Sequence, residues 1–211
     1  MKPRDPALIL EGACEKLLCG EVGSAASLLS AKLPLEEPAR ETRRYSKPQL
    51  VGLFTRDRFT DRYSGNLLVF PGVLLVLSQL VPKEFPYHPN WKFGACHQLY
   101  WQLYPTLDHV VPLSRGGRDQ DSNWVTTSML RNSLKGSWSL DELGWQLQPI
   151  RTDSWDGLIG LFSRLVRTNP SLLEVPAIAQ WRAAARAVQQ AAEADGRGLQ
   201  THRGRGQYEP W

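Results

Sequence analysis

The stretch LYPTLDHVVPLSRGGRDQDSNWVTTSMLRNSLKG, residues 103–136, decides the fold of this chain. Its first part, Leu103–Leu107, suits a strand that ends at Asp108 and His109. β-Branched residues within 123–127 predict a second strand. A proline and a Gly-Gly pair between the two strands supply the geometry of a turn. We therefore expect two strands joined by a loop.

A short helix is expected to follow the second strand. Ser128 has the character of an N-cap, and the helix should run through Leu134 and stop at Gly136. If the strand pair packs on this helix, the strand end bearing the Asp-His pair faces Asn132. Lys135, three residues further on, falls on the same helical face.

This arrangement has a chemical meaning for phosphodiester hydrolysis. A hard divalent cation prefers oxygen ligands, which the carboxylate of Asp108 and the amide carbonyl of Asn132 can supply. A neutral imidazole beside the metal, that of His109, can take a proton from an attacking water near neutral pH. Lys135 would add a cation close to the phosphate. The amide of Asn123 is expected to bond across the loop backbone and brace the strand end.

The run LDHVVPLSRGG, followed by Asn123 and then RNSLKG, resembles the signature of the HNH endonuclease family. The three namesake positions of that family fall on His109, Asn123 and Asn132, and RDRFTDRYSG at residues 56–65 resembles its opening segment. The resemblance implies a ββα-metal core in which Asp108 and Asn132 bind Mg²⁺ or Mn²⁺ and His109 is the general base. It also implies hydrolysis of DNA that leaves 5′-phosphate and 3′-hydroxyl ends.

The chain departs from the commoner family pattern at four positions. Many relatives carry two cysteine pairs that bind a structural zinc, whereas the aligned residues here are Asp61, Ser64, Ser128 and Arg131. A tetrahedral zinc site needs four soft or borderline ligands. We therefore expect no structural zinc, and we expect apolar packing to replace it, with residues 66–80 and the aromatics Tyr100, Trp101 and Trp124 in that role.

The expected architecture is an α+β protein with a central ββα-metal core and flanking N- and C-terminal helices. The domain organisation predicted from composition is an N-terminal helical segment (1–39), the nuclease core (40–150), a C-terminal helical wrap (151–195) and a flexible tail (196–211). Apolar periodicity and capping signals predict one or two helices in 5–33, further helices over 73–80, 139–147, 155–167 and 175–194, and a strand over 67–70.

Basic residues suggest contacts to nucleic acid. The chain has a net charge of +4, and the segment 40–62 holds seven basic against three acidic residues, which is typical either of a phosphate-binding arm or of a solvated face. His97 is an auxiliary site candidate from the preceding segment. The candidate phosphate contacts are Arg43, Arg44 and Lys47 in the basic segment and Arg115 and Arg118 in the loop.

Two other functions are open on sequence grounds. One is a nucleic-acid-binding module that kept the fold without catalysis, and the other is an RNase or toxin-like nuclease with the same residues, so RNA stands beside DNA as the partner. Double-strand cleavage would need a homodimer or two successive nicks. The N-terminus lacks the apolar run of a signal peptide, three cysteines show no metal-ligand spacing, and the apolar stretch 66–82 is broken by Pro71-Gly72. We therefore expect a cytoplasmic protein with no membrane partner.

Overall fold

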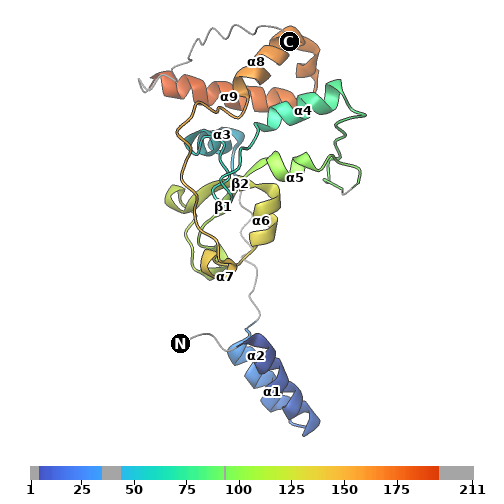
Figure 1. Ribbon diagram of the computed structural model, residues 1–211, viewed down its shortest axis with the longest axis vertical. Coiled ribbons are helices and arrows are strands. Elements are labelled where there is room, and N and C mark those ends of the chain that lie inside the picture. Colours follow the sequence, from blue (N-terminus) through green and yellow to red (C-terminus); the bar gives the residue numbers. More distant parts are fainter. Residues whose placement is uncertain (1–4, 35–43, 93, 195–211) are drawn as a thin grey trace, which may run out of the picture. The chain divides into compact units, whose positions relative to one another are not determined.

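The computed structural model describes residues 5–34, 44–92 and 94–194, and the chain divides into two compact units, residues 1–41 and 42–211 (Figure 1). The second unit combines helices with a two-stranded antiparallel sheet, which confirms the predicted α+β class. No helix in the described ranges has the length and apolarity needed to cross a membrane. The predicted tail, 196–211, lies outside the described residues.

The first unit is a pair of helices, α1 (Pro6–Leu18) and α2 (Val22–Lys32). The side chain of Asp5 caps α1 by accepting a hydrogen bond from the backbone N–H of Ala7. The turn between the helices contains Gly20 at φ +77°, a conformation that favours glycine. Small and branched residues allow the two helices to pack together, and those buried in this unit are Ile9, Ala13 and Ala25.

In the second unit α3 (Lys47–Arg56), α5 (Leu99–Leu103) and α6 (Met129–Lys135) pack on the two-stranded sheet. α9 (Pro176–Ala194) packs on α3 and α4 (Pro71–Leu80), α8 (Ile159–Thr168) packs on α4, and α6 packs on both strands. In Figure 1, α4, α8 and α9 gather at one end of this unit, and the strands with α6 lie at the other. In chain order the elements are α3 (Lys47–Arg56), α4 (Pro71–Leu80), α5 (Leu99–Leu103), β1 (Pro105–His109), β2 (Trp124–Ser128), α6 (Met129–Lys135), α7 (Leu140–Leu143), α8 (Ile159–Thr168) and α9 (Pro176–Ala194), with 3₁₀ turns at Leu113–Arg115, Asp121–Asn123 and Pro170–Glu174.

Phe70, which has no exposed surface, lies at the centre of the helical end. Its ring meets Phe162 of α8 edge-on at 5.0 Å, Trp181 of α9 at 5.7 Å and Phe59 at 6.4 Å between centroids. Edge-to-face contacts of this kind add to the burial of apolar area. The middle of the apolar segment 66–80, residues 68–76, is thus core, as the sequence predicts, whereas Leu80 at its end is 48% exposed.

Helix α3 differs from expectation, because the sequence places an arm or solvated face across 40–62. Ser46 and Gln49 form a capping box at its start. Val51, Leu53 and Phe54 on its inner face are buried. Basic residues on the outer face concealed this amphipathic pattern. Residues 40–43 lie outside the described residues.

One predicted strand is absent from the described residues, and two predicted helices have other boundaries. Residues 67–70 form no regular strand, because the backbone N–H groups of Val69 and Phe70 donate to carbonyls in loops and helix ends instead. The helix from Ser139 ends at Leu143, since Gly144 adopts φ +64°. α8 starts late because Gly157 has φ +67°, and a Cβ there would lie 2.4 Å from the ring of Phe59. Glycine at 157 is therefore required both for conformation and for space.

The predicted order strand, loop, strand, helix is present. β1 begins at Pro105 because Leu103 still belongs to α5. The strands are antiparallel, with Asp108 opposite Val125 and His109 opposite Trp124. The side chain of Ser128 accepts from the backbone N–H of Arg131, so that this residue caps α6 as predicted.

A buried carboxylate holds the turn at 61–65 against the end of β2. Asp61 is 1% exposed. Its Oδ1 accepts from Thr127 Oγ1 at 3.0 Å and from the backbone N–H groups of Tyr63 and Ser64, and its Oδ2 accepts from Ser128 N at 3.1 Å. Such charge-assisted bonds are stronger than neutral ones. Asp61 therefore joins positions 61, 64 and 128, three of the four at which the sequence resemblance led us to look for zinc ligands.

Substitution of Asp61 by Ala should destabilise the second unit. Four donors lose their acceptor in a buried place, so we expect the free energy of unfolding to fall by about 3 kcal/mol. Denaturant titration followed by circular dichroism measures this loss. The matched control is Asp121→Ala, whose side chain is 74% exposed and pairs with Arg56, where at most ~1 kcal/mol is expected. Equal losses in the two variants would contradict the role given to Asp61.

Candidate active site

His109 ends β1, and the loop after it is closed by one asparagine. Asn123 Oδ1 accepts from Val111 N at 2.9 Å, while its Nδ2 donates to the carbonyls of Val111 at 3.0 Å and Arg118 at 2.9 Å. These are the bonds across the loop that the sequence predicts for Asn123. The loop also needs Gly117, because a Cβ there would lie 2.0 Å from the carbonyl oxygen of Val111. The strand end that carries His109 is thereby held in place.

Asp108, the residue before it, is bonded within the protein. Its Oδ2 accepts from the Tyr63 hydroxyl at 2.5 Å and lies 3.0 Å from Lys135 Nζ. Burial raises the pKa of Tyr63, and the negative charge of Asp108 is the second cause of this rise. The hydroxyl of Tyr63 therefore keeps its hydrogen and remains a donor. Asp108 is 8% exposed. Among the described residues these contacts engage Oδ2, so Oδ1 is the oxygen that a ligand would use.

Lys135 has no exposed surface, and it also donates to the carbonyl of His109 at 2.7 Å. The role predicted for it, a cation in contact with a phosphate, does not fit this burial. Its ammonium balances the charge of Asp108 and fixes the backbone at His109. Lys135 therefore acts from inside the protein as a positioning residue.

Asn132, from α6, is turned toward β1. Its Nδ2 donates to Thr106 Oγ1 at 3.0 Å and to the carbonyl of Leu107 at 3.1 Å. Because a carbonyl can only accept, the amide nitrogen must be the atom on that side. The amide oxygen of Asn132 is consequently the atom that can serve as a metal ligand.

The imidazole of His109 contacts three side chains that the sequence analysis did not place in the site. Its Nε2 lies 2.9 Å from Asp119 Oδ1, 3.1 Å from Trp124 Nε1 and 3.5 Å from the hydroxyl of Tyr45. Tyr45 and Trp124 also donate to Asp119 Oδ1, at 2.7 and 2.8 Å. The hydrogen bond from Tyr45 is the main cause that lowers the pKa of Asp119. The hydrogen bonds from His109 and Trp124 lower this pKa further, and partial desolvation acts in the opposite direction.

These contacts favour one tautomer of the imidazole. The indole of Trp124 only donates, and its shorter contact is with the carboxylate of Asp119. In the tautomer whose Nε2–H donates to the same carboxylate oxygen, Nδ1 is the nitrogen that can accept a proton. Asp119 could have been suspected as a partner of His109 from its place in the loop between Gly117 and Asn123. Tyr45 and Tyr63 lie too far from Asp108 and His109 in the sequence for any local pattern to place them in the site.

The basic residues that were predicted to contact phosphate differ in their exposure and in their partners. Arg118 and Arg44 are exposed. Arg115 pairs with Glu142 and lies over the ring of Trp138. Lys47 donates to Gln180 Oε1 at 2.9 Å, and Arg43 lies outside the described residues.

His97, the auxiliary candidate, is placed by packing. Its ring stacks on Phe85 at 4.5 Å, and its Nδ1 accepts from the backbone N–H of Leu99. These contacts hold the start of α5. They give His97 a structural role and do not join it to the His109 cluster, which consists of His109, Tyr45, Asp119 and Trp124.

The donor set fits a hard divalent cation in kind. Among the described residues, no group of three or more His, Cys, Asp or Glu side chains could hold a metal ion. Asp108 and Asn132 nevertheless offer two oxygen atoms, and Mg²⁺ is commonly held by one or two carboxylates together with water and substrate phosphates. Because Lys135 already balances Asp108, a cation at this place would depend on a phosphate for part of its affinity.

Comparison with known proteins gives no relative for this chain: no family model matches it, and neither a curated protein nor a solved structure shows significant similarity. The geometry of the described residues is therefore what supports a function.

Substitution of Lys135 by Met should leave Asp108 as a buried charge without its cation. We expect the free energy of unfolding to fall by about 3–5 kcal/mol. The double variant Lys135→Met/Asp108→Asn should recover part of that loss, because both charges are then absent, and a double-mutant cycle in urea measures the coupling. Lys16→Met, in the exposed pair with Glu21, is the control and should lose at most ~1 kcal/mol. An additive cycle would mean that the pair does not hold the site.

Proposed function

We propose that this protein is a metal-dependent endonuclease of the HNH type that hydrolyses phosphodiester bonds in DNA. The observation that carries the proposal is the position of three groups on two packed elements, β1 and α6. His109 and Asp108 end β1, and Asn132 approaches the same strand from α6. These are an imidazole, a carboxylate and an amide oxygen, in the order of elements that the resemblance implies.

A second observation supports the same assignment. The four positions that correspond to zinc ligands in many HNH proteins are Asp61, Ser64, Ser128 and Arg131. Asp61 bonds the backbone N–H groups of Ser64 and Ser128, and Ser128 bonds that of Arg131. Residues separated by more than sixty positions thus meet where the family would place its metal staple. A chance match of sequence would not predict this meeting.

The residues divide the chemistry among them. A divalent cation, held through Asp108 and Asn132, would stabilise negative charge on the phosphate and the departing oxygen. His109 takes a proton at Nδ1 from the water whose oxygen bonds to phosphorus. The bond from phosphorus to the 3′-oxygen breaks, and that oxygen receives a proton from solvent. Asp119 holds the ring through Nε2, and Lys135 holds the backbone of His109.

Cleavage assays test this function. Purified protein is incubated with supercoiled plasmid, linear DNA or RNA in Mg²⁺, Mn²⁺ or EDTA. We expect plasmid cleavage that EDTA abolishes without a change in far-UV circular dichroism or melting temperature. His109→Ala should lower the rate by roughly 100-fold or more, the usual contribution of a general base, while His88→Ala, outside the site, should not.

Two outcomes would contradict the proposal. A folded protein that binds nucleic acid and cuts neither DNA nor RNA would return the binding-module alternative. Cleavage of RNA alone would assign the same residues to a ribonuclease.

Metal affinity provides an independent readout. Titration calorimetry of Mn²⁺ into His109→Ala, which retains the oxygen ligands, should show tighter binding once a DNA oligonucleotide is present. Asn132→Ala in that background should weaken the DNA-dependent binding by about 10- to 100-fold. The matched control is Asn90→Ala, on an exposed loop. Unchanged affinity in Asn132→Ala would show that its amide is not a ligand.

A further inference from the structure

A pocket of about 330 Å³ lies beside the His109 cluster, and aromatic rings form much of its wall. It is formed by residues from α3, α4, the loop after α4, the end of α5, and α9. Its lining comprises Tyr45, Lys47, Leu50, Leu75, Tyr87, Trp91, Tyr104, Ala177 and Trp181. This volume is at the lower end of the range for small-molecule sites, which suits a single ring system.

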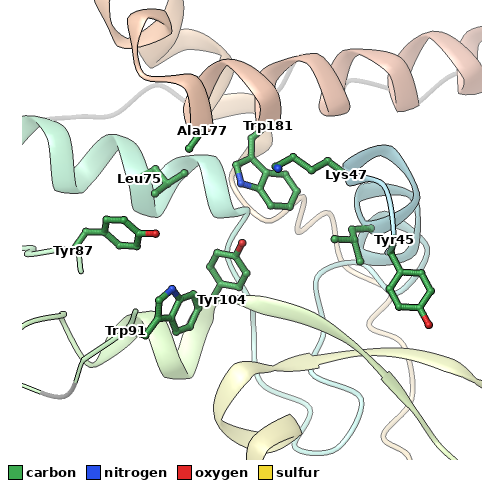
Figure 2. A pocket seen from close by; sticks show the side chains of 9 residues that line it. Tyr45, Lys47, Leu75, Tyr87, Trp91, Tyr104, Ala177 and Trp181 are labelled. Atoms are coloured by element: carbon green, nitrogen blue, oxygen red, sulfur yellow. The ribbon is translucent and has the colours of Figure 1, made fainter. Parts of the chain in front are cut away.

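The rings are arranged as walls. Tyr104 stands edge-on to Trp91 at 4.8 Å and to Trp181 at 6.5 Å. Figure 2 shows the hydroxyl of Tyr87 pointing into the space between Trp91 and Leu75, and the hydroxyl of Tyr104 pointing toward Trp181. Burial raises the pKa of Tyr104, so its hydroxyl stays protonated and can donate. The pocket therefore offers flat apolar faces together with hydrogen-bonding groups.

Charge limits the class of ligand. Aromatic walls also suit quaternary ammonium groups. Here the ammonium of Lys47 already lies 5.5 Å from the ring centroid of Trp181. A second cation would meet that positive charge, whereas a ligand that carries a phosphate would be attracted by it. A planar base attached to a phosphate satisfies both the walls and the lysine.

Tyr45 connects this pocket with the His109 cluster. Its side chain lines the pocket, while its hydroxyl bonds Asp119 and lies 3.5 Å from His109 Nε2. In Figure 2 this hydroxyl points away from the other pocket residues. A base in the pocket and a phosphate at His109 would therefore lie on either side of one tyrosine ring.

We propose that this pocket receives one unstacked nucleobase of the substrate strand while the adjacent backbone lies along Lys47 and the His109 cluster. The proposal rests on the nuclease function proposed above and adds to it a requirement for a base. Enzymes that work on nucleic acids do hold unpaired bases between aromatic side chains, and stacking there tolerates every base because each has a π-face. The site would select single-stranded or distorted nucleic acid without reading its sequence.

Two oligonucleotides of equal charge, one with bases and one without, distinguish the affinity for bases from the affinity for phosphates. One probe is a labelled strand of ten thymidines, and the other is a strand of ten abasic units with the same phosphates. Affinities are measured by fluorescence anisotropy with His109→Ala in EDTA, so that nothing is cut. We expect the thymidine strand to bind about tenfold to a hundredfold more tightly, as stacking energies imply.

Filling the pocket should remove that preference. Ala177→Leu places a larger side chain on the lining without removing a core residue, and Ala183→Leu makes the same change on an exposed position of α9. The preference should disappear in the first variant and remain in the second. Trp91→Ala should also lose it, and Trp91→Phe, which keeps a ring, should retain most of it. Circular dichroism and melting temperature confirm that each variant is folded.

The outcomes distinguish this proposal from the one on which it rests. Equal affinity of the His109→Ala protein with an unchanged pocket for both strands, or a preference that survives in folded Ala177→Leu, overturns the pocket assignment even if wild-type protein cuts plasmid. Loss of the preference in Ala177→Leu supports the pocket, whether or not His109→Ala abolishes cleavage. Competition by tetramethylammonium chloride beyond that by sodium chloride at equal ionic strength would favour a cationic ligand and overturn the proposal.

Discussion

An ammonium group with no exposed surface must find its hydrogen-bond partners inside the protein, and Lys135 finds them at the end of β1. It donates to the carbonyl of His109 and pairs with Asp108, which also accepts from Tyr63. Moving a charged group from water into the protein interior costs free energy unless well-placed partners compensate for it. This requirement fixes α6, β1 and the turn at 61–65 in one arrangement, and the rest of the candidate site is built on that arrangement.

Hydrogen-bonded carboxylates perform a related task beside β2. Asp61 accepts from the N-cap residue of α6 and from the strand before it, and Asp57 accepts from the backbone N–H of Thr126 at 2.7 Å. A carboxylate can accept several bonds at once. We predicted that apolar packing replaces the zinc staple. The aromatic core does support the helices, but the turn itself is joined to β2 by these acidic side chains.

Local pattern was enough to predict the strand pair, the loop and the cap at Ser128, because turn residues, caps and β-branched runs act over short distances in the sequence. It did not predict α3, whose basic outer face concealed its apolar inner face. It also missed Tyr45, Tyr63 and Asp119. The two tyrosines reach the site through tertiary packing over 64 and 45 positions, and no short-range signal encodes such contacts.

The central claim is that the imidazole of His109 accepts a proton during phosphodiester hydrolysis. Chemical rescue tests it most directly: single-turnover cleavage of one DNA oligonucleotide by His109→Ala is measured in Mg²⁺ while free imidazole is added. The account predicts slow cleavage that rises with imidazole concentration, requires the divalent cation and is absent for Asn132→Ala treated in the same way. Cleavage by His109→Ala at the wild-type rate without imidazole would contradict the claim.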